Sequence, residues 1–174
     1  MTRALLTLAL AAVLSTGPAV ASAAPRSEAA RLRQVEDRFE IQRLLTDYGR
    51  DLDARDWTAF SQLFAEKGQW VGGFGVVTGP AAIHDAMVRA IGTKPGANYH
   101  ILTNFEVDFT GPDTAKAWSR WSFVGVTADN KPALLMGGHY DDILVREHGR
   151  WRFLRREAPA DVPANLPTGA AAAK

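Results

Sequence analysis

Cysteine is absent from the 174-residue sequence, which excludes a disulfide framework and thiolate chemistry. The sequence also lacks an H-E-x-x-H metal motif, the Gly-x-Ser-x-Gly elbow of serine hydrolases, and the spacing and lysine of a phosphate-binding loop. An excess of one charge is missing too, since 20 basic side chains balance 19 acidic ones, so we expect no nucleic-acid partner. We therefore expect neither a metal nor a cofactor, and any chemistry must come from ordinary side chains.

The N-terminal segment has the pattern of a secretory signal. Arg3 supplies a positive charge, residues 4–14 form a short apolar run, and Ala21-Ser22-Ala23 has the small residues of a cleavage site. The run is too short to span a bilayer, and with no cysteine after it a lipid anchor at that site is excluded. We expect cleavage after about Ala23 and a periplasmic or secreted protein that is not membrane-bound.

The rest of the chain suits one domain, residues 24–158, in which the hydrophobic period changes from helical to strand-like. The predicted helices are 27–53, 57–64 and 81–91. The predicted strands are 69–71, 76–78, 99–109, 114–127, 133–145 and 151–158. Helices followed by a meander of long strands indicate an α+β fold. Gly137-Gly138 should make a bulge or sharp bend, and the Pro- and Ala-rich residues 159–174 should be disordered.

Polar groups interrupt the apolar stripe of the first helix, which consists of Ile41, Leu44, Leu45, Tyr48 and Leu52. Tyr48 places a hydroxyl within the stripe, and Asp53 follows where the helix ends. A buried hydroxyl or carboxylate needs a hydrogen-bonding partner. We expect that partner to be His100, and the three side chains to line a pocket. Helix spacing alone leaves Asp51 open as the acid, because it lies closer to the stripe than Asp53 does.

Several fragments together resemble the nuclear transport factor two-like superfamily, in particular its SnoaL-like branch. They are Glu40-Ile-Gln-Arg-Leu-Leu-x-x-Tyr48, Asp53-x-Arg-Asp-Trp57, Gly79-Pro80 before a helix, Tyr99-His-x-x-Thr-Asn104, Gly137-Gly-x-Tyr140 and Gly149-Arg-Trp-Arg-Phe153. The resemblance spans nearly all of residues 40–157. It implies a cone-shaped α+β barrel, in which a strongly curved antiparallel sheet wraps around the N-terminal helices and leaves a deep pocket at the wide end.

The branch includes scytalone dehydratase, bile-acid 7-alpha-dehydratase and gamma-hexachlorocyclohexane dehydrochlorinase, which share an Asp on the first helix paired with a His on the first long strand. The resemblance places this pair at Asp53 and His100 and an assisting Tyr at Tyr48. The substrate-binding residues that we expect are Arg156, Asn104 and Trp70. Strand parity leaves open whether Arg155 or Arg156 faces the pocket.

These residue types predict a cofactor-free elimination or isomerisation of a hydrophobic cyclic small molecule. His100 would be the general base, Asp53 would orient it, and Tyr48 would act as the acid or oxyanion donor. Two alternatives remain, because the superfamily also contains non-catalytic members: a binding domain for a hydrophobic small molecule, and a dimerisation module. We expect a homodimer or homotrimer. A metal at His139 and Asp141 is disfavoured because no supporting cluster accompanies them.

Overall fold

The structure is a computed structural model that describes residues 27–162. The helices are α1 (Glu28–Ala54), α2 (Trp57–Ser61) and α3 (Pro80–Ile91). The strands are β1 (Phe64–Gly72), β2 (Gly75–Thr78), β3 (Tyr99–Phe109), β4 (Thr114–Val126), β5 (Pro132–Glu147), β6 (Arg150–Glu157) and β7 (Ala160–Val162). The expected secretory signal, residues 1–23, lies outside the described residues.

The helix boundaries follow from local capping. The Ser27 hydroxyl accepts a hydrogen bond from the Ala30 backbone N–H at the start of α1, and the Asp56 carboxylate caps α2 through the Ala59 N–H. Helix α1 ends at Arg55, whose backbone is left-handed with φ 59°. Helix α3 carries Pro80 at its first position, as the sequence predicts.

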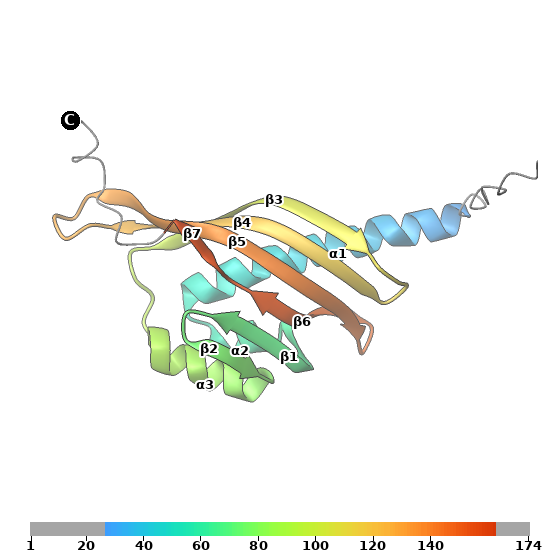
Figure 1. Ribbon diagram of the computed structural model, residues 1–174, viewed down its shortest axis with the longest axis horizontal. Helices are drawn as coiled ribbons and strands as arrows, with labels where there is room; N and C mark the ends of the chain where they lie inside the picture. Colours follow the sequence, from blue (N-terminus) through green and yellow to red (C-terminus); the bar gives the residue numbers. More distant parts are fainter. Residues whose placement is uncertain (1–26, 163–174) are drawn as a thin grey trace, which may run out of the picture.

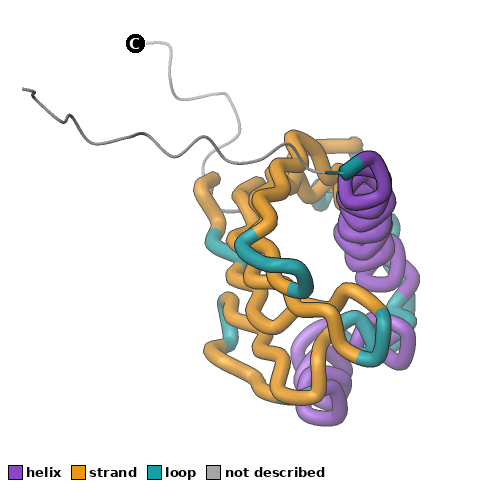
Figure 2. The backbone as a smooth tube through the Cα atoms, turned by 90° about the vertical axis from the view of Figure 1, so that its right-hand side faces the viewer, coloured by secondary structure: helices purple, strands orange, loops and turns teal. Residues whose placement is uncertain are grey.

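A seven-stranded sheet runs in the order β2-β1-β6-β5-β4-β3, and β7 pairs with β5 beside this path. The sheet is curved and unclosed, with helices along one face of it (Figures 1 and 2). The α+β prediction is confirmed. The expectation of a wholly antiparallel sheet is wrong, because β1 pairs with β6 in parallel. The two strands belong to distant parts of the chain, so no hairpin imposes antiparallel pairing on them.

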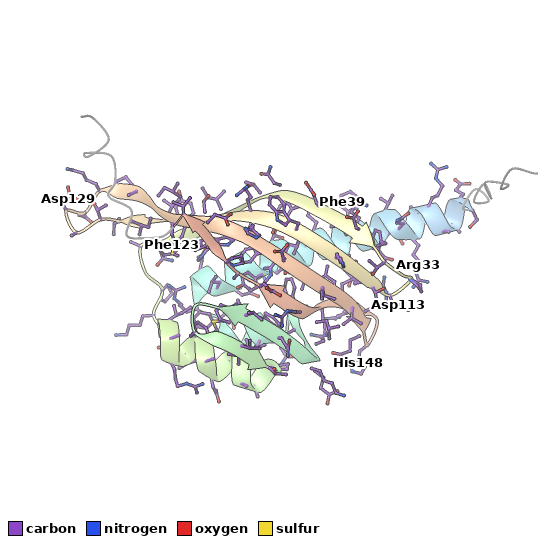
Figure 3. The ribbon with its side chains drawn as sticks, viewed as in Figure 1. Arg33, Phe39, Asp113, Phe123, Asp129 and His148 are labelled. Atoms are coloured by element: carbon purple, nitrogen blue, oxygen red, sulfur yellow. The ribbon has the colours of Figure 1, made fainter. Side chains whose placement is uncertain are left out.

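The core lies between α1 and the sheet. All five residues of the predicted stripe are buried: Ile41, Leu44, Leu45, Tyr48 and Leu52. The first turns of α1 extend beyond the sheet, and Phe39, which lies where the helix reaches the sheet, faces solvent (Figure 3). In the same view Arg33 lies near the hairpin that carries Asp113, and their charged groups are 3.9 Å apart. The C-terminal half of α1 therefore makes the core and carries Tyr48 and Asp53.

The second predicted helix is too long and the strand after it is too short. Helix α2 ends at Ser61, and Phe64 already belongs to β1, opposite Phe153 of β6. The Leu63 carbonyl accepts a hydrogen bond from the Phe153 N–H at 2.9 Å. Pairing with β6 thus overrides the helical spacing of the apolar residues.

The predicted disordered tail, residues 159–174, starts too early in the chain, because residues 160–162 form β7. The Gly137-Gly138 pair explains why this strand can approach. A Cβ added at Gly138 would lie 2.1 Å from the Pro159 carbonyl oxygen. The register of β4 against β5 shifts just before the glycine pair, between Leu134 and Met136, because Phe123 pairs with Met136 and Val124 pairs with Leu134. The glycine pair therefore provides space for the chain after β6 and does not bulge against β4.

Candidate active site

Asp53 and His100 form a two-point contact between the end of α1 and the start of β3. The Asp53 carboxylate lies 2.6 Å from His100 Nδ1 and accepts the His100 backbone N–H at 2.8 Å. A carboxylate can only accept, so this contact assigns the ring proton to Nδ1 and leaves a lone pair on Nε2. Both side chains are largely shielded, with 20% and 12% of their areas exposed. The two contacts fix the position of the ring and its tautomer together.

His100 forms part of the wall of a cavity of about 360 Å³. Its other lining residues are mainly apolar or aromatic: Tyr48, Leu52, Arg55, Trp70, Gly73, Phe74, Met87, Ile91, Trp121, Phe123, Met136, Tyr140 and Ala158. Phe123 packs on the His100 ring at 4.9 Å between centroids, and it lies toward the end of the sheet where β4 leads to the Asp129 turn (Figure 3). The cavity is suited to a hydrophobic cyclic molecule.

Tyr48 lies in the same cavity, but its hydroxyl partner is not His100 as we expect from the sequence. Trp70 Nε1 donates to the Tyr48 oxygen at 3.0 Å, and the phenol of Tyr140 also interacts with it. Burial raises the pKa of Tyr48, while the charge of Arg156 and the bond from Trp70 oppose that rise. The phenol therefore keeps its proton at neutral pH. Its oxygen is occupied as an acceptor, so the proton is available to a ligand.

Tyr140 is a site residue that the sequence analysis did not single out for a role. It is 2% exposed, lines the cavity and packs edge-on against Tyr48 with centroids 5.3 Å apart. Burial raises its pKa well above the ordinary value. Only its appearance in the Gly137-Gly-x-Tyr140 fragment could have directed attention to it. The two phenols form one of the polar groups in a mainly apolar wall, together with His100 and Arg55.

Arg156, and not Arg155, points inward, yet it does not line the cavity. Its Nε and Nη2 donate to the two carboxylate oxygens of Asp142 at 2.8 and 2.7 Å. The guanidinium lies 4.1 Å from the ring centroids of Tyr48, Tyr140 and Phe153. Arg156 therefore does not reach a substrate in the cavity, contrary to our expectation from the sequence. Asp142 on the neighbouring strand binds its guanidinium and holds it beneath the two phenols.

Asn104 and Trp70, the other two expected substrate-binding residues, have different surroundings. Trp70 lines the cavity, bonds Tyr48 and stacks on Phe74 with centroids 4.1 Å apart. Asn104 is exposed and left-handed, with φ 57°, within a register shift of β3 against β4. That irregularity breaks the alternation which would place Asn104 on the face of His100. Asn104 is not among the residues that line the cavity.

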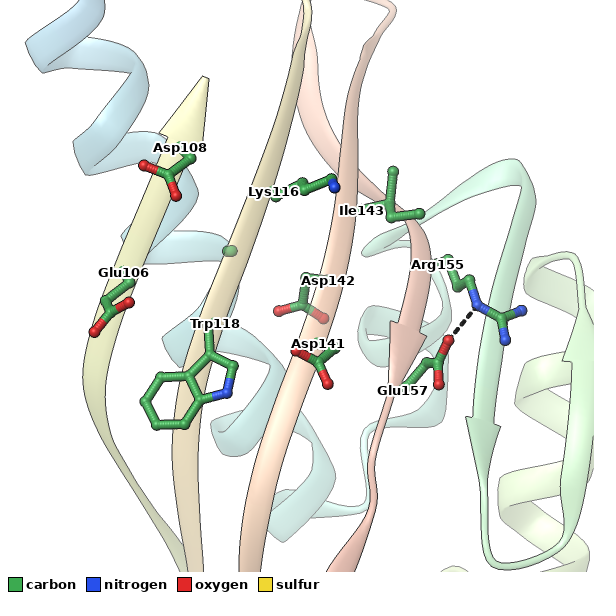
Figure 4. A pocket seen from close by; sticks show the side chains of 10 residues that line it. Glu106, Asp108, Lys116, Trp118, Asp141, Asp142, Ile143, Arg155 and Glu157 are labelled. Carbon is green, nitrogen blue, oxygen red and sulfur yellow. Dashed lines mark hydrogen bonds and ion pairs between the residues drawn. The ribbon is translucent and has the colours of Figure 1, made fainter. Parts of the chain in front are cut away.

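The outer face of the sheet carries another cavity of about 340 Å³, with Glu106, Asp108, Trp118, Asp141 and Glu157 around it (Figure 4). Among the described residues no group of three or more potential metal ligands is present. His139 contacts two carboxylates, that of Asp161 in β7 through Nδ1 at 2.9 Å and that of Asp141 through Nε2 at 3.3 Å. Between residues 27 and 162, no helix has the length and apolar character to cross a membrane.

Comparison with solved structures agrees with this architecture. A nuclear transport factor two-like protein with a cystatin-like fold from Novosphingobium aromaticivorans is 30% identical, with TM-score 0.66 over 74% of this chain and 84% of that one. A scytalone dehydratase-like protein from the same species is 25% identical, with TM-score 0.62 over 79% and 99% of the two chains. A hexachlorocyclohexane dehydrochlorinase from Novosphingobium barchaimii shares the fold at 20% identity, with TM-score 0.67 over 75% and 90%.

The family comparison covers most of the described domain. The model of the SnoaL-like domain matches residues 33–157, which include α1 from residue 33 onward, the sheet from β1 to β6, and all the residues that line the cavity except Ala158. The match thus takes in Tyr48, Asp53 and His100. The chain belongs to the SnoaL-like domain family.

Proposed function

We propose that the protein is an exported, cofactor-free lyase or isomerase of the dehydratase type, which acts on a hydrophobic cyclic small molecule. The observation that carries the proposal is the two-point contact of Asp53 with His100 at the wall of an apolar cavity. The similarity to a scytalone dehydratase-like protein supports the dehydratase type.

His100 acts as the general base in this proposal. Its Nε2 removes a proton from a substrate carbon next to a carbonyl, and Asp53 stabilises the imidazolium that forms. In an elimination, the electrons of the broken C–H bond form the new C=C bond as the C–O bond breaks. The hydroxyl leaves as water with a proton from Tyr48. In an isomerisation, the Tyr48 hydroxyl instead donates a hydrogen bond to the oxygen of the enolate, and the imidazolium of His100 returns its proton to a different carbon of the substrate.

Arg156 supports this chemistry from beneath the phenols. Its charge opposes the rise in the pKa of Tyr48 that burial causes, which makes the Tyr48 proton easier to donate. Arg156 is therefore a positioning residue in this proposal. The phenol of Tyr140 also interacts with the Tyr48 hydroxyl and, like Arg156, lowers its pKa.

The test begins with turnover of cyclic β-hydroxy ketones and steroid-like alcohols by residues 24–174. His100→Ala and Asp53→Asn should each lower kcat/KM roughly 10²- to 10⁴-fold, the range of general acid–base catalysis. Tyr48→Phe should lower it roughly 10²-fold, as expected for one lost oxyanion donor. His100→Ala and Asp53→Asn should unfold at temperatures close to that of the wild type, whereas Tyr48→Phe should unfold at a lower temperature because the buried Trp70 Nε1 loses its acceptor.

Two control variants make the result specific. His84→Ala removes an exposed histidine on α3, and Asp51→Asn removes the other acid that helix spacing permits. Both should keep wild-type turnover. Unchanged turnover in His100→Ala and Asp53→Asn would refute the dyad and leave a binding domain. Export is tested by the intact mass of protein from its native source, where a mass that still includes residues 1–23 contradicts cleavage.

A further inference from the structure

Arg55 follows the last residue of α1 and lines the cavity. Its left-handed backbone at the end of α1 turns the side chain toward the cavity, where it forms part of the wall with His100. Nη1 donates to the Leu52 carbonyl, and Nη2 lies 3.5 Å from Oδ1 of Asn98. The guanidinium also lies 5.7 Å from the centroid of the Trp57 ring. These contacts hold a cation in a defined position.

The charge of Arg55 is not neutralised by the protein around it. Arg55 has no ion pair with a carboxylate in the part of the chain from residue 27 to residue 162. The nearest acids in sequence have other partners, since Asp53 binds His100 and Asp56 caps α2. Arg156, by comparison, donates from Nε and Nη2 to the Asp142 carboxylate. The cavity wall therefore includes a guanidinium that has no ion pair with a carboxylate of residues 27–162.

Two buried donors at this point also lack an acceptor. Nε of Arg55 and Nδ2 of Asn98 are inaccessible to solvent and donate to no other atom of residues 27–162. Asn98 does not line the cavity, and both of these atoms are closed to solvent, so a molecule in the cavity would meet the rest of the Arg55 guanidinium. An anionic group would gain the most from this contact, because hydrogen bonds between ions are the stronger ones.

We propose that Arg55 is a specificity-determining residue, which binds a carboxylate or another anionic substituent of a hydrophobic cyclic substrate. The apolar wall from Leu52, Met87, Ile91 and Phe123 would take the ring, and Arg55 would hold the acidic group at the end of the cavity near His100. That the bound molecule is a substrate rests on the proposed function. The preference for an acid rests only on the cavity and on Arg55.

The experiment measures binding of a matched pair of probes, 2-naphthoate and its neutral amide, 2-naphthamide, by calorimetry at pH 7. The wild type should bind the acid at least tenfold more tightly than the amide, and Arg55→Met should reduce that preference to less than twofold. Arg55→Lys keeps the charge and should be intermediate. Arg50→Met is the matched control, since Arg50 lies on the same helix with 59% of its side chain exposed. It should leave the preference unchanged.

Three results would overturn the proposal: equal affinity of the wild type for acid and amide, an unchanged preference in Arg55→Met, or no binding of either probe. If Arg55→Met does not fold, the preference of the wild type in rising salt decides, because a contact between ions weakens as salt increases. His100→Ala separates this proposal from the mechanism. This variant should lose turnover and still prefer naphthoate to naphthamide. Unchanged turnover would refute the dyad of Asp53 and His100 and leave the Arg55 proposal intact.

Discussion

Arg156→Met tests the buried ion pair beneath the two phenols. Arg156 is fully buried, and Asp142, its partner, is 3% exposed. The substitution keeps much of the aliphatic stem but leaves the Asp142 carboxylate without its two donors at 2.8 and 2.7 Å. It also removes the cation from the three rings that lie 4.1 Å from it.

The expected loss is large because one buried charge remains without its partner. Removing one member of a buried pair costs about 3–5 kcal/mol, and the ring contacts place this variant in the upper part of that range. Replacing both residues, as Arg156→Met with Asp142→Leu, should recover most of the loss, since apolar groups of similar volume often substitute for a buried pair at little cost. Asp142→Leu alone should also be costly, because it leaves the buried guanidinium of Arg156 unpaired. The two single losses should therefore far exceed the loss of the double variant, and the double-mutant cycle should give a coupling energy of at least about 3 kcal/mol.

The pKa of Asp142 determines whether the stability loss of Arg156→Met grows or shrinks with pH. Burial raises the pKa of Asp142 above 3.8, while Arg156 opposes the rise. The folded protein thus holds this proton more tightly than the unfolded chain does. The stabilising contribution is fully present below the unfolded pKa and is lost as the pH rises through the folded pKa. Without Arg156 the pKa of Asp142 rises further, so the deficit of the variant should be largest at neutral pH and should narrow on acidification.

Urea unfolding at pH 7 and at pH 5 measures both effects. The single variant should lose stability at pH 7 with an unchanged m-value, and its deficit relative to the wild type should be smaller at pH 5. A loss below about 1 kcal/mol at pH 7, well under the cost of breaking a buried pair, would refute the reasoning. So would a deficit that grows as the pH falls.

Two further predictions concern packing. Trp121→Ala should lower the free energy of unfolding in urea by about 3–5 kcal/mol, because Trp121 is 7% exposed and donates to the His139 carbonyl at 3.0 Å. Trp118→Ala on the opposite face of β4 should lower it distinctly less. Equal small losses in the two variants would contradict the assigned faces of β4. Gly138→Ala should displace the chain at Pro159 and increase hydrogen exchange in β7, and Gly137→Ala, whose nearest backbone neighbour would be 3.3 Å away, is the control; unchanged exchange in the Gly138 variant would show that β7 does not depend on that approach.

Much of the fold and part of the site follow from the sequence, for identifiable reasons. The periodicity of the stripe from Ile41 to Leu52 determines α1 and its buried face, and alternation determines the bounds of β3. Asp53 could be chosen only through resemblance to a family, because helix spacing favours Asp51. The structure brings Asp53 to His100 and pairs Asp51 with Arg50.

Tertiary structure decided what depends on partners distant in sequence. The parallel pairing of β1 with β6, the start of β1 at Phe64, and β7 all rest on backbone hydrogen bonds to distant strands, which no local period encodes. The position of Arg156 beneath the phenols depends on Asp142, a neighbour only within the sheet. Arg55 lines the cavity because its own backbone is left-handed at the end of α1 and because its guanidinium contacts Asn98, 43 residues away. Local sequence sets the periodicity of an element, whereas burial and non-local hydrogen bonding determine which charged side chain faces the cavity.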